Sequence, residues 1–256
     1  MQTLTIVKVG GKIVEDPAAL SNLLSRFTRI PGNKILVHGG GRTATQVATK
    51  LGYETHMIDG RRVTDADMLR VVTMVYGGLV NKGVVAGLEA RGECALGMTG
   101  ADCGIIISRK RAATPVDYGF VGDVERVDAQ RLASVVGQGI TPVLAPLTFD
   151  GKGQLLNTNA DTIAGETAKA MAKLYDVTLV YCFEKPGVLA NADDDGSVIP
   201  EIHEADFKGL VESGTVSGGM IPKIQNALQA VAAGVKRVVI TSAADLDITG
   251  GTQILP

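Results

Sequence analysis

Short apolar segments that alternate with helix-forming segments are the feature of this sequence that most limits its fold. Each apolar segment is bounded by glycine, proline or polar residues and is apolar on both faces. Strands of that kind are typical of a parallel sheet covered by helices on both sides. The alternation therefore predicts an α/β sandwich with a mostly parallel sheet.

The expected strands and helices follow from this pattern. The strands are predicted at Thr3–Val9, Lys34–His38, Cys94–Met98, Ile140–Ala145, Thr178–Cys182 and Arg237–Thr241. The helices are predicted at Pro17–Phe27, Thr43–Leu51, Asp65–Glu89, Asp128–Val136, Ala160–Leu174, Glu204–Glu212 and Met220–Ala233. Threonine, proline and glycine break up Lys110–Val127 between short β-like runs, which predicts an antiparallel excursion there.

Charge and hydropathy exclude several classes of protein. The 25 basic and 27 acidic residues are dispersed along the chain, so charge gives no indication of nucleic-acid binding. No apolar run approaches the length that spans a bilayer, and the N-terminus lacks the features of a signal peptide. Three scattered cysteines and three scattered histidines match neither a disulfide framework nor a zinc site. We expect a cytoplasmic protein with no structural metal and no membrane partner.

The first stretch that could bind an anion is "LTIVKVGGK", residues 4–12. It is not a Walker A loop, because Ile13 follows Lys12 and the upstream glycine is missing. The N–H groups of Gly10 and Gly11 could still bind an anion, with Lys8 pointing at it. The alternative is a strand lysine whose ammonium group reaches an exposed edge.

A second candidate lies in "ILVHGGGRTATQVA", residues 35–48. Three glycines after a strand let the backbone approach a ligand closely, and a helix start adds unpaired N–H groups. An anionic group is expected to bind there, although a simple strand-to-helix turn is the alternative.

Three further stretches are weaker on their own. "DGRRVTDADM" offers an arginine fork for a carboxylate, or only surface charge. "LLNTNADTIAGETA" places Asn157, Asn159 and Asp161 before a helix, where Asn159 could equally be an N-cap. "VSGGMIPKIQNAL" places Lys223 in an early turn of a helix, or only on the surface.

Taken together and in order, these stretches resemble the amino acid kinase family, and within it the kinases of N-acetylglutamate. The resembling elements are "VKVGGK", "VHGGG", "GRRVT", "NTNAD" and "GGMIPK", spread over almost the whole chain. The resemblance implies a three-layer αβα sandwich. It also implies phosphorylation of the side-chain carboxylate of N-acetyl-L-glutamate by ATP with Mg²⁺, the second step of arginine biosynthesis. Roughly residues 1–150 would bind the acyl amino acid and form the dimer, and roughly residues 151–256 would bind ATP.

The resemblance also implies roles for single residues. Lys8 and Lys223 would stabilise the transferring phosphoryl group, and Asp161 would hold both lysines. Arg62 and Asn157 would bind the substrate's α-carboxylate and acyl-amide region, beside Gly40 and Gly41. Phosphate and nucleotide contacts would come from Gly10, Gly11, Lys185, Gly187 and Gly219, and no protein residue is expected to be the main ligand of Mg²⁺. The segment "CFEKPGVL", residues 182–189, departs from the shorter T/S-D-V-x-G loop of many relatives, so Lys185 and Gly187 are only possible contacts.

Several alternatives stay open at this point. N-succinyl-L-glutamate would need only a roomier or more basic pocket, and other amino acid kinases share the fold. A catalytically silent nucleotide or amino-acid sensor is a different class, against which the presence of Lys8, Lys223 and Asp161 argues. His38 is a general-base candidate by position only. The chain starts on its first strand, without the N-terminal helix of the arginine-inhibited hexameric relatives, so we expect a homodimer. The resemblance implies small-molecule substrates.

Overall fold

A computed structural model describes residues 1–58, 60–191, 193–217, 220–244, 246 and 248–255. Eight strands form the central sheet in the order β12-β14-β13-β11-β1-β2-β8-β5. Their bounds are β1 (Thr3–Val9), β2 (Asn33–His38), β5 (Ala95–Met98), β8 (Thr141–Leu144), β11 (Asp176–Phe183), β12 (Glu201–Ile202), β13 (Arg237–Ser242) and β14 (Thr252–Ile254). All neighbouring pairs are parallel except β13 with β14. The expected mostly parallel sheet is confirmed.

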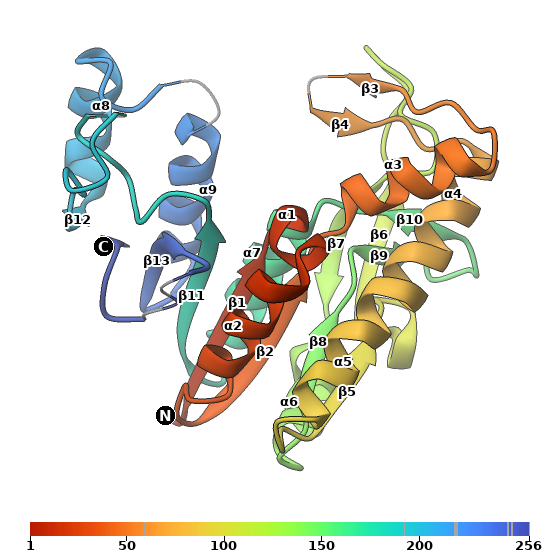
Figure 1. The fold of residues 1–256 in the computed structure, drawn as a ribbon, viewed down its shortest axis with the longest axis horizontal. Helices are drawn as coiled ribbons and strands as arrows, with labels where there is room; N and C mark the ends of the chain where they lie inside the picture. Colours follow the sequence, from red (N-terminus) through yellow and green to blue (C-terminus); the bar gives the residue numbers. More distant parts are fainter. Residues whose placement is uncertain (59, 192, 218–219, 245, 247, 256) are drawn as a thin grey trace.

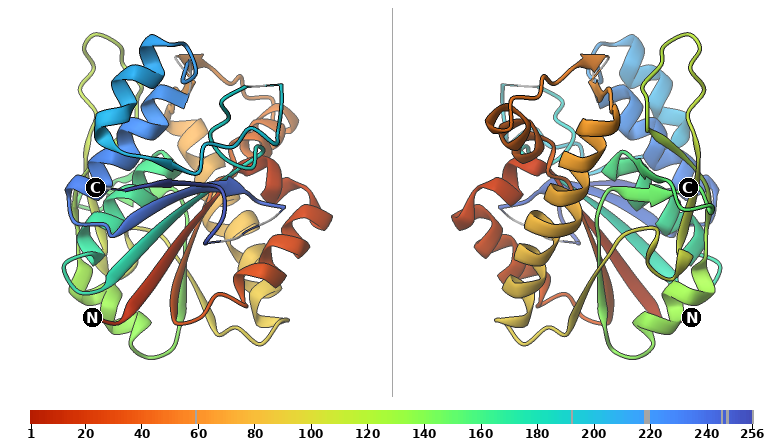
Figure 2. Two further views of the ribbon diagram at one scale, coloured as in Figure 1. Left: turned by 90° about the vertical axis from the view of Figure 1, so that its left-hand side faces the viewer. Right: turned by 90° about the vertical axis from the view of Figure 1, so that its right-hand side faces the viewer.

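Helices cover both faces of the sheet, which gives three layers (Figure 1 and Figure 2). Their bounds are α1 (Gly11–Glu15), α2 (Pro17–Phe27), α3 (Gly41–Lys50), α4 (Ala66–Val72), the π-helix η1 (Thr73–Val80), α5 (Asn81–Glu89), α6 (Ala129–Val136), α7 (Ala160–Met171), α8 (Glu204–Glu212) and α9 (Met220–Ala232), with a short 3₁₀ turn η2 (Asp102–Gly104). Helices α6, α7 and α9 pack on one face, together with Leu4 and Ile6 of β1. Helices α2 and α5 pack on the other, together with Val7 and Val9. The period-2 alternation of a strand explains this division of β1 between two cores.

Two smaller sheets lie beside the main one. The sheet β10-β9-β6-β7 consists of β6 (Ile106–Lys110), β7 (Gly122–Val127), β9 (Leu147–Phe149) and β10 (Leu155–Asn157). Its antiparallel pair β6–β7 confirms the expected excursion over Lys110–Val127. The third is the hairpin of β3 (Met57–Ile58) and β4 (Arg61–Arg62).

The expected helix Asp65–Glu89 differs from the prediction in its middle. Asp65 caps α4 through a hydrogen bond from the Met68 N–H, and eight residues from Thr73 then form wider π-helical turns before α5. The stretch Ala66–Glu89 is long and apolar enough to cross a membrane, contrary to the expectation that no such run exists. Its buried face, which includes Val72 and Leu88, packs into the core of this domain, so it is accounted for as a core helix.

The strand order predicts a ligand-binding crevice at the carboxyl ends of the central strands. From β1 the chain proceeds to β2 on one side, and β11 joins β1 on the other. Ligands of open α/β sheets bind at the carboxyl ends of strands where the strand order reverses in this way. Lys8, Gly10 and His38 are at those ends.

Candidate functional site

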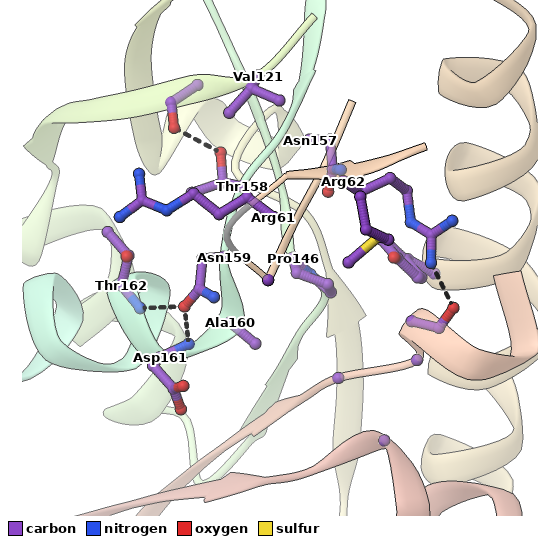
Figure 3. Close-up of a pocket in the computed structure, with 18 of the residues that line it drawn as sticks. Arg61, Arg62, Val121, Pro146, Asn157, Thr158, Asn159, Ala160, Asp161 and Thr162 are labelled. Carbon is purple, nitrogen blue, oxygen red and sulfur yellow. Dashed lines mark hydrogen bonds between the residues drawn. The ribbon is translucent and has the colours of Figure 1, made fainter. Parts of the chain in front are cut away.

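A cavity of about 610 Å³ opens beside the carboxyl ends of β1 and β2. That volume is within the usual range of small-molecule sites. Its lining comes from the glycine turns, the β3–β4 hairpin, the second sheet and the start of α7 (Figure 3). Lys223 and Asn226 in the first turns of α9 complete it. The predicted site residues among the lining are Gly11, Gly40, Gly41, Arg62, Asn157, Asp161 and Lys223. Tertiary structure therefore brings together residues from all five sequence stretches in the wall of one cavity.

The two glycine turns touch each other. The Gly39 N–H donates to the Val9 carbonyl at 2.9 Å, and a Cβ on Gly39 would lie 3.0 Å from the Gly11 nitrogen. A Cβ on Gly11 would lie 3.4 Å from the Gly40 nitrogen. Side chains on either turn would separate the two backbones. The N–H groups of Gly40 and Gly41 have no acceptor within the described part of the chain and can bind an anion.

Lys8 is on the face of β1 that it shares with Leu4 and Ile6, which is the face covered by α7. Its ammonium Nζ lies 2.7 Å from the Asp161 carboxylate in the first turn of that helix. Asn159 caps α7 by accepting hydrogen bonds from the N–H groups of Asp161 and Thr162 (Figure 3). The cap fixes the helix start and hence the position of Asp161. The Lys8 side chain is only 10% exposed, so the ion pair makes its burial in a strand tolerable.

Lys223, in the first turns of α9, approaches the same place from the other half of the chain. Its Nζ lies 3.9 Å from the centroid of the Phe183 ring, and the Lys8 Nζ lies 5.6 Å from that centroid. Burial lowers the pKa of Lys223; the Asp161 charge opposes this shift and the Lys8 charge adds to it. Lys223 makes no direct ion pair with a carboxylate among the described residues. Asp161 therefore holds Lys8 directly and acts on Lys223 only through its field.

Arg62 and Asn157 are both tied to neighbouring groups. The Arg62 Nη2 donates to the Gly41 carbonyl at 2.7 Å and to the Thr45 hydroxyl at 2.8 Å, and Arg62 is 8% exposed. The Asn157 Nδ2 donates to the Thr64 hydroxyl at 2.9 Å. These bonds fix the two side chains in the cavity wall, with Arg62 supporting the start of α3.

Sequence reasoning missed the lining residues Tyr76 and Arg111, and it included Arg61 only in the arginine fork of "DGRRVTDADM", with the specific role given to Arg62. Arg111 follows β6, where no motif marks it; its Nε donates to the Asp123 carboxylate at 2.9 Å, and its guanidinium lies 5.6 Å from the centroid of the Tyr118 ring. Tyr76 is in the apolar π-helix, where an aromatic residue indicates only core packing. The β6–β7 connection pairs with Thr64 beside the β3–β4 hairpin, and the Arg111 N–H donates to the Val121 carbonyl, so Arg111 lies on the same side of the cavity wall as Arg62.

His38 lies outside the cavity wall. It is completely buried, and burial lowers its pKa to about 4, so the imidazole is neutral near pH 7. Position along the chain suggested a general base, but a ring with no exposed surface cannot reach a substrate.

Four further predicted contacts are absent from the lining of this cavity, and one of them lies outside the described residues. The Lys185 ammonium is 2.8 Å from the Asp195 carboxylate. A Cβ on Gly187 would lie 2.7 Å from the Thr252 hydroxyl, so close packing accounts for that glycine. Gly10 follows β1 as the N-cap residue of α1, and Gly219 lies outside the described residues.

Comparison with known proteins matches residues 3–242 to the model of the amino acid kinase family. The chain is 61% identical over 253 residues to the acetylglutamate kinase of Bacteroides thetaiotaomicron, covering 99% of this chain and 98% of that protein. It is 60% identical over 254 residues to the acetylglutamate kinase of Parabacteroides distasonis, covering 99% and 100%. Among solved structures, smu.665 from Streptococcus mutans UA159 superposes with a TM-score of 0.79 at 27% identity, over 98% of each chain.

Proposed function

The chain belongs to the amino acid kinase family, and from that premise we infer that it phosphorylates the side-chain carboxylate of N-acetyl-L-glutamate with ATP. This is the acetylglutamate kinase reaction, EC 2.7.2.8, in arginine biosynthesis. Full-length relatives near 60% identity support the activity. The observation from the structure that carries it is the convergence of Lys8 and Lys223 on Phe183, beside two touching glycine turns.

The chemistry explains why such a site would suffice. A glutamate side chain has a pKa of about 4.3 and is already ionised near neutral pH, so the nucleophile needs no general base. The obstacle is the approach of an anionic carboxylate to an anionic phosphate. Phosphoryl transfer is catalysed mainly by alignment and by stabilisation of the charge on the transferring group. Ammonium groups and fixed N–H donors provide both.

We assign the roles accordingly. Lys8 and Lys223 stabilise the transferring phosphoryl group, and Asp161 orients Lys8. The N–H groups of the Gly10–Gly11 and Gly40–Gly41 turns donate hydrogen bonds to the transferring phosphoryl group and to the acyl amino acid. Arg62 and Asn157 bind the α-carboxylate and the acyl-amide region.

The nucleotide is assigned to the C-terminal part of the chain, roughly residues 151–256, and the acyl amino acid to roughly residues 1–150. Lys223 and Asn226 belong to the C-terminal part of the chain and line the cavity, which supports placing the γ-phosphate of ATP there. Lys185, Gly187 and Gly219 remain proposed nucleotide contacts. The described residues hold no cluster of three or more histidine, cysteine or carboxylate side chains suited to a metal ion. Mg²⁺, which keeps much of its water, would therefore be held mainly by the nucleotide phosphates.

We also propose a cytoplasmic homodimer. The outer face of the helix Ala66–Glu89 exposes Met74 by 55% and Leu79 by 63%. Strand β5, at the sheet edge beside α5 (Figure 1), is the neighbouring element. Its Leu96 is 43% exposed. Large exposed apolar side chains close to an unpaired sheet edge favour association with a second copy.

One observation favours a second acyl group. Arg61 and Arg111 add two guanidinium groups to the cavity that already contains Arg62. Asp123 and Tyr118 hold Arg111, so its charge is fixed on the wall. An N-succinyl group has a distal carboxylate that such a cation would bind, whereas an acetyl group has none. N-succinyl-L-glutamate is therefore the second candidate substrate.

An ATP-dependent hydroxamate assay tests these assignments. N-acetyl-L-glutamate, N-succinyl-L-glutamate, free L-glutamate and L-aspartate are compared, with the wild-type chain and Arg111→Gln. Turnover of an acylated glutamate is expected, with weak turnover of the free amino acids. If N-succinyl-L-glutamate is the preferred substrate, Arg111→Gln should raise the KM for it at least about tenfold and leave the KM for N-acetyl-L-glutamate unchanged. Absence of hydroxamate with every substrate would favour the silent sensor and contradict the proposed kinase.

A further inference from the structure

The buried histidine at the end of β2 has two hydrogen-bonding partners that the reaction chemistry does not explain. The His38 Nδ1 lies 2.7 Å from the Gly39 carbonyl oxygen. The Nε2 on the other side of the ring lies 3.1 Å from the Asn81 amide nitrogen, at the start of α5. The ring thus connects a core helix to the first peptide of the triple-glycine turn.

Asn81 determines which ring nitrogen carries the proton. Its Nδ2 also lies 2.9 Å from the Val143 carbonyl oxygen, an acceptor that only an N–H group can approach so closely. The NH₂ group therefore faces both partners and donates its second hydrogen to the His38 Nε2. With Nε2 as acceptor, the neutral ring has its proton on Nδ1 and donates it to the Gly39 carbonyl.

That hydrogen bond sets the direction of an N–H group on the cavity side. In a trans peptide, the C=O and the N–H point to opposite sides of the chain. Because the Gly39 carbonyl points at His38, the Gly40 N–H of the same peptide points away from it. Gly40 lines the cavity, and its N–H has no acceptor in the described part of the chain.

Packing restrains the same peptide from a second direction. Gly40 has a φ of 156° and a ψ of 14°, a conformation that favours glycine. A Cβ there would lie 3.1 Å from the Tyr76 ring, which comes from the π-helix, a kind of segment often found near functional sites. The turn is therefore held by backbone contacts, by the Tyr76 ring and by the hydrogen bond from His38.

We propose that His38, with its tautomer fixed by Asn81, is a positioning residue that aims the Gly40 N–H at the transferring phosphoryl group. This inference rests on the proposed phosphoryl transfer and deepens it. His38 touches neither substrate, and it acts through the peptide that it orients. The neutral state of the ring is consistent with this role, since a donor at Nδ1 needs no positive charge.

Two substitutions separate positioning from packing and from base catalysis. In His38→Asn, the amide nitrogen can occupy the place of Nδ1 and still donate to Gly39. In His38→Gln, the longer amide reaches only the place of Nε2, so the donor to Gly39 is lost. We expect His38→Asn to keep kcat within about threefold of the wild type. His38→Gln should lower kcat roughly 10- to 100-fold with little change in either KM. The Gly40 N–H is misdirected and not removed, so the loss is smaller than the loss on the order of 10²–10³ in kcat that follows deletion of one preorganised donor.

The affinity for ADP with aluminium fluoride and N-acetyl-L-glutamate, measured by calorimetry, should fall in parallel with kcat, while the affinity for ADP alone should not. Equal losses in the two variants, or a fully active His38→Gln, would overturn the proposal. If the wild type itself makes no hydroxamate, the proposed function fails instead.

A measurement on the wild-type chain does not depend on how the variants fold. The ¹⁵N spectrum of labelled histidine should show His38 protonated at Nδ1 and unprotonated at Nε2 near pH 7. A proton on Nε2 would break the connection between Asn81 and the Gly39 carbonyl and would contradict the proposal.

Discussion

The Lys8 ammonium group on β1 lies 2.7 Å from the Asp161 carboxylate at the start of α7. The two residues are distant in the sequence, and they meet because β1 pairs with β11 while α7 covers that face. The pair keeps a buried cation in a strand that is otherwise apolar. It also leaves Lys8 beside Phe183 and the glycine turns, where a phosphoryl group would lie.

Replacement of Lys8 should reduce turnover far more than replacement of Lys12. Lys8→Ala is expected to lower kcat by about 10²–10³, because a cation that stabilises the transition state is lost. Lys12 is a matched control, since it is close in the chain but its ion pair with Glu184 is exposed. Steady-state assays should show Lys12→Ala within about tenfold of the wild type. Similar losses in the two variants would contradict the assignment of Lys8.

Lys223 should give the enzyme an alkaline limit. The ammonium form is the active one, and burial lowers its pKa below the ordinary value of 10.5. The kcat/KM for ATP reports the free enzyme and should therefore fall as pH rises through that lowered pKa. Folding lowers this pKa, so the contribution of Lys223 to stability rises with pH over the same window. In Lys223→Arg, the fall of kcat/KM for ATP at alkaline pH should disappear. If the fall is unchanged in this variant, it belongs to the titration of another group.

Arg62 should affect the acyl amino acid more than the nucleotide. Arg62→Lys keeps the charge but loses the planar fork that reaches both the Gly41 carbonyl and the Thr45 hydroxyl. We expect the KM for the acyl amino acid to rise at least about tenfold, with the KM for ATP changed less than about twofold. Arg70→Lys, on the exposed side of α4, is the control. A rise confined to the KM for ATP would reverse the assignment of the two lobes.

A single substitution that introduces a charged side chain can test the proposed dimer face. Leu79→Glu places a carboxylate on the exposed side of η1 and should shift a dimer to monomers in sedimentation velocity experiments. Leu51→Glu changes another exposed leucine at the end of α3 and should leave the dimer intact. A wild-type chain that sediments as a monomer would exclude the proposal.

Local sequence signals predicted much of the secondary structure. The helices Pro17–Phe27 and Glu204–Glu212 have the predicted bounds, because Asp16 and His203 end the preceding segments and begin each helix. The helix Gly11–Glu15 was missed, since a glycine pair followed by five residues looks like a turn. The short strands β3, β4, β9 and β10 were also missed, because two or three residues have no measurable period.

The sequence by itself determined the layered α/β fold, the family and most of the charged residues of the site. Strand ends, glycine turns and helix starts are local features, and their order along the chain is specific. Only the tertiary structure decided which of those residues meet. Helix α7 on that face of β1 gives Lys8 its partner Asp161, and the pairing of β1 with β11 brings Phe183 close to Lys8, with Lys223 also on its ring. Burial turned His38 from a base candidate into a neutral donor, and Arg111 lies in the cavity wall although no local motif marks it. Long-range strand pairing and burial decide these relationships, and neither has a local signal in the sequence.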